Sequence, residues 1–265
     1  MFPVLFKIGD FQFATYGLFV AAGYLAGILW LSRSYKRMGL TEPQFWGLVY
    51  ALFFGAILGG KLLYWMLGWR EILSGELRLV RDFRFGFVFY GGLVGTLVSG
   101  WIMSRRYRFD FLKITDYFLT ALPMGHAIGR LGCFSVGCCA GQPTDLPWGV
   151  RFTDPASLVP TYLLGVPLHP SQLYSVFANI AVFAAAYAVL RRVQKGRLPA
   201  GSAAGAYIAL YSLARFFIEF SRGDDRGGFV LGMSVSQWIS LAGILGAGLL
   251  LKRLGAFGAA RKRRT

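Results

Sequence analysis

Four polar side chains near the end of a long apolar stretch have the types and spacing of an anion site. They are Tyr211, Arg215, Glu219 and Arg222. Their spacings of four, four and three residues would place all of them on one face of a helix. Guanidinium groups bind phosphate through paired hydrogen bonds, so Arg215 oriented by Glu219 predicts a phosphate site. The alternative is a purely structural ion pair between Arg215 and Glu219 at a membrane surface.

A second arginine lies in a run of small residues at the end of an earlier apolar stretch. The run is Gly129-Arg130-Leu131-Gly132, and its glycines allow close backbone approach around Arg130. A charged side chain beside the hydrocarbon is costly, which makes Arg130 a functional candidate. The side chain could instead extend along its helix to reach the interface. Two arginines that converge on one cavity would favour a lipid phosphate as the ligand.

All three cysteines of the chain lie close together in the sequence. Cys133, Cys138 and Cys139 lack the C-x-x-C spacing of a zinc site, and three thiols are one ligand short of a structural set. His126 or His169 would have to complete it. A disulfide is a further alternative, and it would leave one thiol free. The leading interpretation is that the three are small, buried, apolar side chains, with no metal.

The run 168–174 has the composition of a helix start. Pro170 and Ser171 suit the first helical positions, where missing backbone donors cost little. His169 and Gln172 would then face the outer membrane surface near the cavity. For His169, a capping or packing role is the alternative to a part in the chemistry.

The composition is that of a membrane protein. Hydrophobic residues make up 55% of the 265 residues and charged residues 15%, whereas about a quarter are charged in soluble domains. Seven apolar stretches are close to the roughly 20 residues that cross the hydrocarbon. We therefore expect an all-α integral membrane protein with a single polytopic domain over residues 1–265. The expected transmembrane helices are 13–31, 44–68, 86–103, 112–129, 170–190, 200–220 and 230–251.

The basic residues set the expected orientation. Lys and Arg outnumber Asp and Glu by 28 to 12, and most of them fall on the connections that share a side with the C-terminus. The positive-inside rule then predicts an outside N-terminus and a cytoplasmic C-terminus, with the basic run 261–264 as an anchor on anionic lipid. Because no soluble basic domain is present, the surplus charge is assigned to membrane lipids and not to nucleic acid.

This orientation places one irregular segment, at about 130–169, on the outer face. It carries the three cysteines, five prolines and Trp148, and long irregular loops in compact proteins are usually functional. Tyr16 and Tyr90 fall at the outer ends of the first and third spans, where aromatic residues are common. The chemistry is therefore expected where the spans meet the outer membrane face.

Taken together, these residues resemble the prolipoprotein diacylglyceryl transferases, bacterial membrane enzymes that begin lipoprotein maturation. The resemblance extends over nearly the whole chain, and the ordered combination of motifs is specific. The motifs are Tyr16-Gly17, Phe89-Tyr90-Gly91-Gly92-Leu93, Gly129-Arg130-Leu131-Gly132, Gly141, His169-Pro170-Ser171-Gln172-Leu173-Tyr174, and the set Tyr211, Arg215, Glu219 and Arg222.

The resemblance implies a seven-span enzyme of the bacterial cytoplasmic (inner) membrane that acts toward the outer leaflet. Its substrates would be phosphatidylglycerol and the signal peptide of a prolipoprotein, whose lipobox cysteine thiol receives the diacylglyceryl group as a thioether while glycerol phosphate leaves. No metal or organic cofactor is implied. The catalytic candidates that carry over are Arg130, Arg215, Glu219 and Tyr90. The substrate-binding candidates are Tyr16, Cys133, Gly141, His169, Gln172, Tyr211 and Arg222.

The chemistry of this reaction agrees with the residue types. Displacement at a glyceryl carbon needs stabilisation of the departing phosphate, which Arg130 and Arg215 would supply. A neighbouring cation would also lower the pKa of the acceptor thiol from its usual value of about 8.5. In this scheme Glu219 orients Arg215.

Four positions depart from the family pattern, which leaves the general base unassigned. The pattern commonly has His at Tyr90, Asn at Cys133, an acidic residue at Cys138 and Glu at Ser175. Tyrosine, with an unperturbed pKa of about 10, is a poor base. The departures keep three alternatives open: a non-catalytic phosphatidylglycerol-binding paralogue, a transferase with a different acceptor, and a zinc or redox membrane protein built on the cysteines.

Overall fold

The computed structural model describes residues 3–8, 11–74, 86–223 and 228–256. The chain divides into two compact units, which are described separately: residues 1–31 with 115–265, and residues 32–114. The expectation of one domain stays a prediction, and the basic run 261–264 lies outside the described residues.

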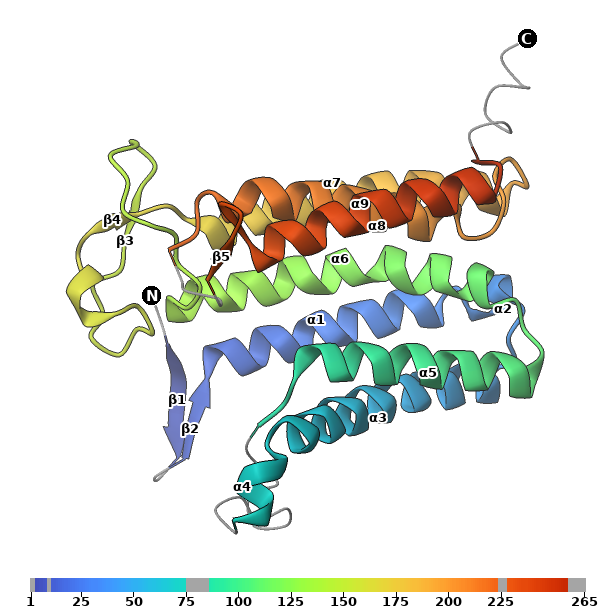
Figure 1. Cartoon of the computed structure of the whole chain (residues 1–265), viewed down its shortest axis with the longest axis horizontal. Coiled ribbons are helices and arrows are strands. Elements are labelled where there is room, and N and C mark those ends of the chain that lie inside the picture. The colour runs from blue at the N-terminus through green and yellow to red at the C-terminus, as the bar shows by residue number, and fades with distance from the viewer. Residues whose placement is uncertain (1–2, 9–10, 75–85, 224–227, 257–265) are drawn as a thin grey trace. The chain divides into compact units, whose positions relative to one another are not determined.

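Within the described residues, seven long helices occupy the seven stretches expected from hydropathy (Figure 1). They are α1 (Thr15–Ser32), α3 (Glu42–Leu67), α5 (Phe89–Tyr107), α6 (Phe111–Val136), α7 (Ser171–Gln194), α8 (Ser202–Glu219) and α9 (Val235–Arg253). The short helices are α2 (Tyr35–Met38), α4 (Trp69–Leu73) and the 3-10 turn Thr161–Leu163. Three antiparallel strand pairs complete the described part: β1 (Val4–Ile8) with β2 (Phe11–Ala14), β3 (Val150–Arg151) with β4 (Pro167–Leu168), and β5 (Phe229–Val230) with β6 (Met233–Ser234).

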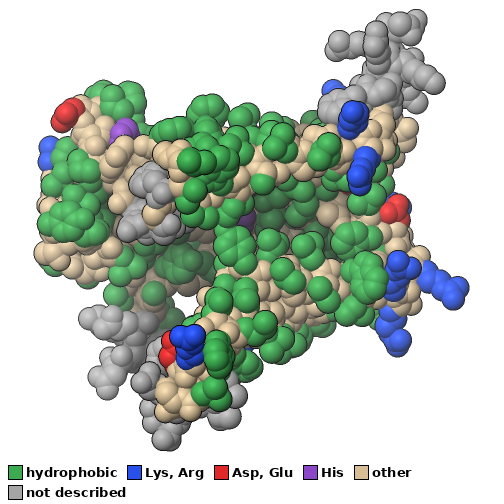
Figure 2. All heavy atoms as spheres, in the orientation of Figure 1, with side chains coloured by type: hydrophobic (Ala, Val, Ile, Leu, Met, Phe, Trp, Pro, Cys, Tyr) green, Lys and Arg blue, Asp and Glu red, His purple; other side chains and the backbone are tan. Residues whose placement is uncertain are grey.

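The chain is a multi-pass membrane protein. By length and composition, α1, α3, α7 and α9 are each able to cross a membrane. The other three long helices carry charges that lower their hydropathy, for example Asp116 and Arg130 in α6 and Arg215 in α8. Large apolar side chains are exposed along the helices, as in Phe177 at 69%. Figure 2 shows such side chains on the flanks of the helices and Lys and Arg side chains near helix ends.

In the unit 32–114, glycines bring α3 and α5 into backbone contact. A Cβ atom built at Gly59 would lie 2.2 Å from the carbonyl oxygen of Gly91, and one built at Gly95 would lie 2.1 Å from that of Gly55. A side chain at these positions would force the helices apart. The small residues therefore allow the two helices to pack closely.

In the other unit, α6, α7, α8 and α9 pack side by side, and α1 lies against α6 (Figure 1). The core between α7 and α8 contains Val182, Ala186 and Tyr207, with Leu119 of α6 packed against it. A smaller core of Phe152, Val159 and Leu168 lies within the irregular segment. Each core is made by side chains far apart in the sequence, so these contacts fix how the helices are arranged.

A buried carboxylate joins α6 to the start of α8. Asp116 is fully buried, and its two carboxylate oxygens accept hydrogen bonds from the backbone N–H groups of Gly201 and Ala204, each at 2.8 Å. The first N–H groups of a helix have no partner within the helix, and its N-terminus carries partial positive charge. Asp116 therefore caps α8 from a neighbouring helix.

Replacing Asp116 with alanine is expected to lower the free energy of unfolding by about 2–4 kcal/mol, because two buried N–H donors lose a charged acceptor. Thermal unfolding of the detergent-solubilised protein measures this change. Asp110→Ala is the matched control, since Asp110 caps the start of α6 at an exposed site, where a cap is worth about 1 kcal/mol. Equal melting-temperature shifts for the two variants would contradict the assigned role.

Candidate active site

Five helix ends meet the irregular segment at one end of the unit formed by residues 1–31 and 115–265 (Figure 1). The helices α1, α7 and α9 begin there, while α6 and α8 end there. The irregular segment starts after Val136, later than expected, because α6 continues beyond residue 129. Arg130 and Cys133 therefore lie on a helix, which fixes the direction of both side chains.

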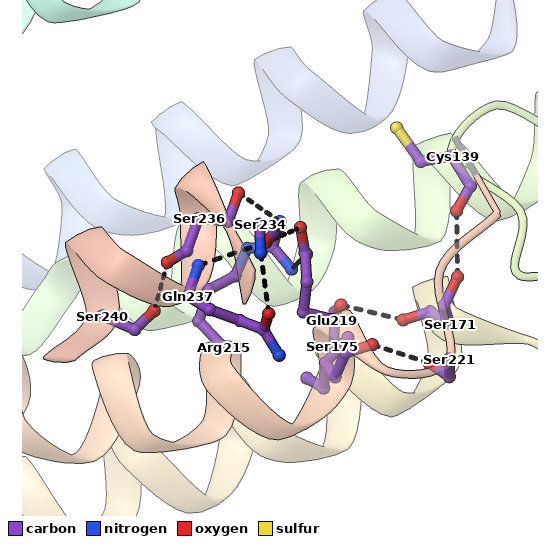
Figure 3. Close-up of polar contacts among 11 residues, drawn as sticks. Cys139, Ser171, Ser175, Arg215, Glu219, Ser221, Ser234, Ser236, Gln237 and Ser240 are labelled. Carbon is purple, nitrogen blue, oxygen red and sulfur yellow. Dashed lines mark hydrogen bonds and ion pairs between the residues drawn. The ribbon is translucent and has the colours of Figure 1, made fainter. Parts of the chain in front are cut away.

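Arg215 and Glu219 form an ion pair at this end of α8 (Figure 3). Both side chains are mostly buried, with 14% and 10% of their surface exposed. Arg215 also donates to the hydroxyl of Ser236 at 3.1 Å, and the hydroxyl of Ser234 donates to Glu219 at 2.8 Å. The expected pairing is thus present, and it is tied to the first turn of α9.

Ser234 belongs to a capping box that sequence inspection missed. Its hydroxyl accepts from the N–H of Gln237 at 3.2 Å, and the Gln237 side chain accepts from the N–H of Ser234 at 2.9 Å. The signal was readable in the sequence, because Ser-x-x-Gln before an apolar run is typical of a helix start. The cap holds the start of α9, and with it the two serines that position the ion pair.

Arg222 does not share the helix face of Arg215, contrary to expectation. The helix ends at Glu219, and Arg222 lies in the following turn, bridged to Gly141 of the irregular segment. Its side chain instead lies beside the Cys139 sulfur. The spacing rule failed here because it assumes that the helix continues through residue 222.

Arg130 lies within electrostatic reach of Tyr16 and His126. The ring of Tyr16 packs on the α6 backbone at Gly132, where a Cβ would lie 3.4 Å from a ring carbon. The ring of His126, one turn before Arg130, lies 5.7 Å from that of Tyr211, centroid to centroid. Tyr16 and Tyr211 therefore flank the helical turn that presents Arg130.

The three cysteines gather at the end of α6. Their sulfur atoms all lie within 4.8 Å of one another, and no disulfide joins them. Hydrogen bonds among the sulfurs, together with Arg222, lower the pKa of the Cys139 thiol, while bonds to Cys133 and Cys139 raise the pKa of the Cys138 thiol. The three thiols are therefore electrostatically coupled to one another.

The start of α7 holds the backbone of this cysteine turn. The side chain of Gln172, fully buried, donates to the carbonyl of Cys138 at 2.9 Å, and the hydroxyl of Ser171 donates to that of Cys139 at 3.0 Å. Cys139 has a φ of 58°, which costs a residue other than glycine about 1 kcal/mol or more. Figure 3 shows its carbonyl turned toward Ser171 and its sulfur turned away.

His169 supports this region through its backbone. Its carbonyl accepts from the N–H of Gly141 at 2.9 Å, and its ring nitrogen Nδ1 lies 3.2 Å from the hydroxyl of Tyr174. Pro170 precedes the first residue of α7, so the expected helix start is confirmed. These contacts fit the packing alternative for His169.

Gly141 is enclosed by backbone on two sides. A Cβ atom there would lie 2.4 Å from the carbonyl oxygen of Ser221 and 2.5 Å from both the carbonyl oxygen and the Cβ of His169. Only glycine allows the irregular segment to pass between the end of α8 and the start of α7. Its role is therefore to place Arg222 and the cysteine turn.

Gly141→Ala is expected to reduce by about 100-fold the rate of the diacylglyceryl transfer that the resemblance implies, since displacement of a site by about 1 Å has effects of this size. Gly246→Ala is the matched control, because a Cβ in the middle of α9 meets open space. The transfer rate and the melting temperature are measured for both. Wild-type turnover by Gly141→Ala would show that the segment has room to move.

Tyr90, the fourth catalytic candidate, is the second residue of α5 and belongs to the other unit. Its side chain is 51% exposed. The site described above therefore contains Arg130, Arg215, Glu219, Arg222 and the cysteines, while the part assigned to Tyr90 stays a prediction.

Comparisons with known proteins point to one family. Residues 3–253 match the model of a family described as prolipoprotein diacylglyceryl transferase. The chain is 34% identical over 245 residues to a phosphatidylglycerol–prolipoprotein diacylglyceryl transferase of Clostridium tetani, covering 92% of this chain and 94% of the relative. It is 35% identical over 262 residues to a protein of the same name from Geobacter sulfurreducens, with coverage of 95% and 96%.

Proposed function

The chain belongs to the prolipoprotein diacylglyceryl transferase family, and we propose that it performs the reaction for which its relatives are named. It transfers the diacylglyceryl group of phosphatidylglycerol to a prolipoprotein. The acceptor is the thiol of the lipobox cysteine. A carbon–sulfur bond forms, the bond between the glyceryl carbon and the phosphate oxygen breaks, and glycerol phosphate leaves.

The departing phosphate is bound by Arg130 and Arg215. Both come from the same unit, and both lie at the helix ends that meet the irregular segment. Glu219 and Ser236 hold Arg215, and Ser234 holds Glu219, so the guanidinium is oriented before the lipid binds. A preorganised cation stabilises charge that develops in the transition state without further reorganisation.

The acceptor peptide approaches from the side of Tyr16 and the cysteine turn. Tyr16 lies beside Gly132 and within electrostatic reach of all three thiols and Arg130. Gln172 and Ser171 keep the turn fixed, so they act as positioning residues. Tyr211 lies against His126, one helical turn before the arginine.

The proposal also includes the topology: the chain crosses the inner membrane with seven helices, and its N-terminus lies outside. The last turns of α5, α7 and α9 are basic, with Arg105, Arg191 and Lys252 among the residues there. The positive-inside rule assigns these ends to the cytoplasm. Because α7 begins beside the irregular segment and ends in a basic turn, the site faces the outer leaflet.

The observation that carries the proposal is the mostly buried Arg215–Glu219 pair held by the first turn of α9, in a chain matched over residues 3–253 to this family. The test is an assay in detergent with phosphatidylglycerol and a synthetic lipobox peptide, read by mass spectrometry. The expected result is a diacylglyceryl adduct on the peptide cysteine. Lipid binding without adduct would instead favour a non-catalytic paralogue, and glycerol phosphate release without the peptide would favour another acceptor.

A further inference from the structure

We propose that Cys133, Cys138 and Cys139 form a binding site for a thiophilic divalent metal ion such as Zn²⁺, with an open fourth position that takes the acceptor thiol. The second half of this inference rests on the proposed function. It revises the expectation of no metal, which came from the resemblance and from the spacing in the sequence.

The sulfur geometry fits such an ion. All three sulfur atoms lie within 4.8 Å of one another. In a tetrahedral zinc site, with metal–sulfur bonds of about 2.3 Å, neighbouring sulfurs are about 3.8 Å apart. Small rotations of the cysteine side chains would therefore bring the three thiolates around one ion.

The backbone that carries these sulfurs is held in place before any ligand binds. Cys133 is buried on α6, and Cys138 and Cys139 are tied through their carbonyls to Gln172 and Ser171, both fully buried. Preorganised ligands and outer hydrogen bonds of this kind raise metal affinity. The spacing of the cysteines in the sequence, five residues and then one, does not indicate a metal site, because α6 must end and the chain must turn before the sulfurs meet.

Charge and accessibility favour an open site. Three thiolates around a divalent ion leave one negative charge, and Arg222 beside Cys139 and Arg130 near Cys133 supply positive charge. Cys138 and Cys139 are partly exposed, so the cluster is reachable from outside. Among the residues that the structure describes, the group contains no fourth His, Cys, Asp or Glu ligand. Three protein ligands with an open position are typical of catalytic zinc.

The open position would activate the acceptor thiol. A thiol that coordinates the ion releases its proton to solvent and becomes a bound thiolate. Its sulfur then bonds to the glyceryl carbon while the carbon–oxygen bond to phosphate breaks, and glycerol phosphate leaves with that electron pair. The product is a thioether, a weaker ligand than a thiolate, which allows it to dissociate. This would supply the thiol activation that Tyr90 is poorly suited to provide.

Metal binding is tested without lipid or peptide, on reduced, metal-free protein in detergent. Because the chain has only 3 cysteines, every thiolate signal comes from this cluster. Titration with Co²⁺ is expected to give the visible bands of tetrahedral, thiolate-bound cobalt at one ion per chain, displaced by Zn²⁺. Cys133→Ser, Cys138→Ser and Cys139→Ser should each weaken binding by more than about 100-fold, since even outer-shell changes cost about 10- to 100-fold.

Ser135→Ala is the matched control on the same turn of α6, where the hydroxyl bonds only locally, to the carbonyl of Gly132 at 2.8 Å. It should bind Co²⁺ as the parent does. The proposed site would be overturned if Co²⁺ binding were not saturable or if it survived the triple Cys→Ser change. It would also be overturned by a disulfide between two of the thiols in the protein before reduction.

The open position has its own test. Addition of a lipobox peptide to the Co²⁺ protein should shift the visible bands, whereas the same peptide with Ser in place of Cys should not. Unchanged bands with the cysteine peptide would overturn the assignment of the fourth ligand. Full transfer by chelator-treated, metal-free protein would overturn the catalytic role of the metal but not the proposed transferase function. Metal binding without any adduct would instead contradict the proposed transferase function.

Discussion

Replacing Arg130 with alanine is expected to lower kcat for diacylglyceryl transfer by about 100- to 1000-fold, the effect of removing one preorganised donor from a developing anion. The reason is that Arg130 lies on the last turns of α6, within electrostatic reach of Tyr16 and His126, where the phosphate is proposed to leave. The measurement is the rate of adduct formation with saturating phosphatidylglycerol and lipobox peptide. Arg130→Lys should recover part of the rate, because it keeps the charge and loses the paired hydrogen bonds.

The control for this prediction is Arg192→Ala. Arg192 lies in the basic last turn of α7, away from the irregular segment, so its loss should leave kcat unchanged. Melting temperatures of both variants separate lost chemistry from lost folding. Near-parental turnover by a folded Arg130→Ala protein would remove this arginine from the mechanism.

Glu219→Ala is expected to weaken phosphatidylglycerol binding and to lower kcat/KM by about 10- to 100-fold, since residues that orient a ligand-binding group have effects of this size. Glu219 holds Arg215 by an ion pair and is itself held by Ser234. Without the carboxylate, Arg215 keeps its contact with Ser236 but loses the partner that sets its direction. Lipid binding and transfer are measured on the same preparation.

Two comparisons sharpen the result for Glu219. Glu219→Gln preserves a hydrogen-bond acceptor and should lose less than Glu219→Ala. In the double variant with Arg215→Ala, the two losses should not add, because both changes remove the same oriented guanidinium. Loss of transfer with phosphatidylglycerol binding fully spared would contradict the orienting role.

The seven long helices were predictable because hydropathy and length depend on local composition. The expected span 170–190 begins within one residue of α7, where Pro170 and Ser171 mark the start. The predicted end of the fourth span, at residue 129, was wrong because α6 continues to Val136. The run after Arg130 is neither strongly apolar nor strongly charged, so hydropathy does not show this continuation. The orientation and the number of helices that span the membrane stay predictions.

The site was predictable where its partners are close in the sequence. The ion pair of Arg215 with Glu219 follows from a spacing of four residues, and it is present. The contact of Arg222 with Cys139 and the bonds from Asp116 to α8 join residues far apart in the sequence, so no spacing rule reports them. They depend on how the helices pack.

The cysteines show the same limit. Their spacing argued against a metal set, and the resemblance implied none. The structure brings the sulfurs within 4.8 Å because α6 ends at Val136 and the chain reverses through Cys139 at a positive φ. A pattern based on C-x-x-C spacing describes a single turn and does not describe this arrangement.

The most direct test of the central claim compares the binding of phosphatidylglycerol with that of diacylglycerol, which has the same acyl chains and no phosphate. The parent protein is expected to prefer phosphatidylglycerol strongly. The double variant Arg130→Ala with Arg215→Ala should bind the two lipids with nearly equal affinity, because the groups proposed to recognise the phosphate are gone. A double variant that folds and keeps the parental preference would contradict the account, since the phosphate would then be recognised elsewhere.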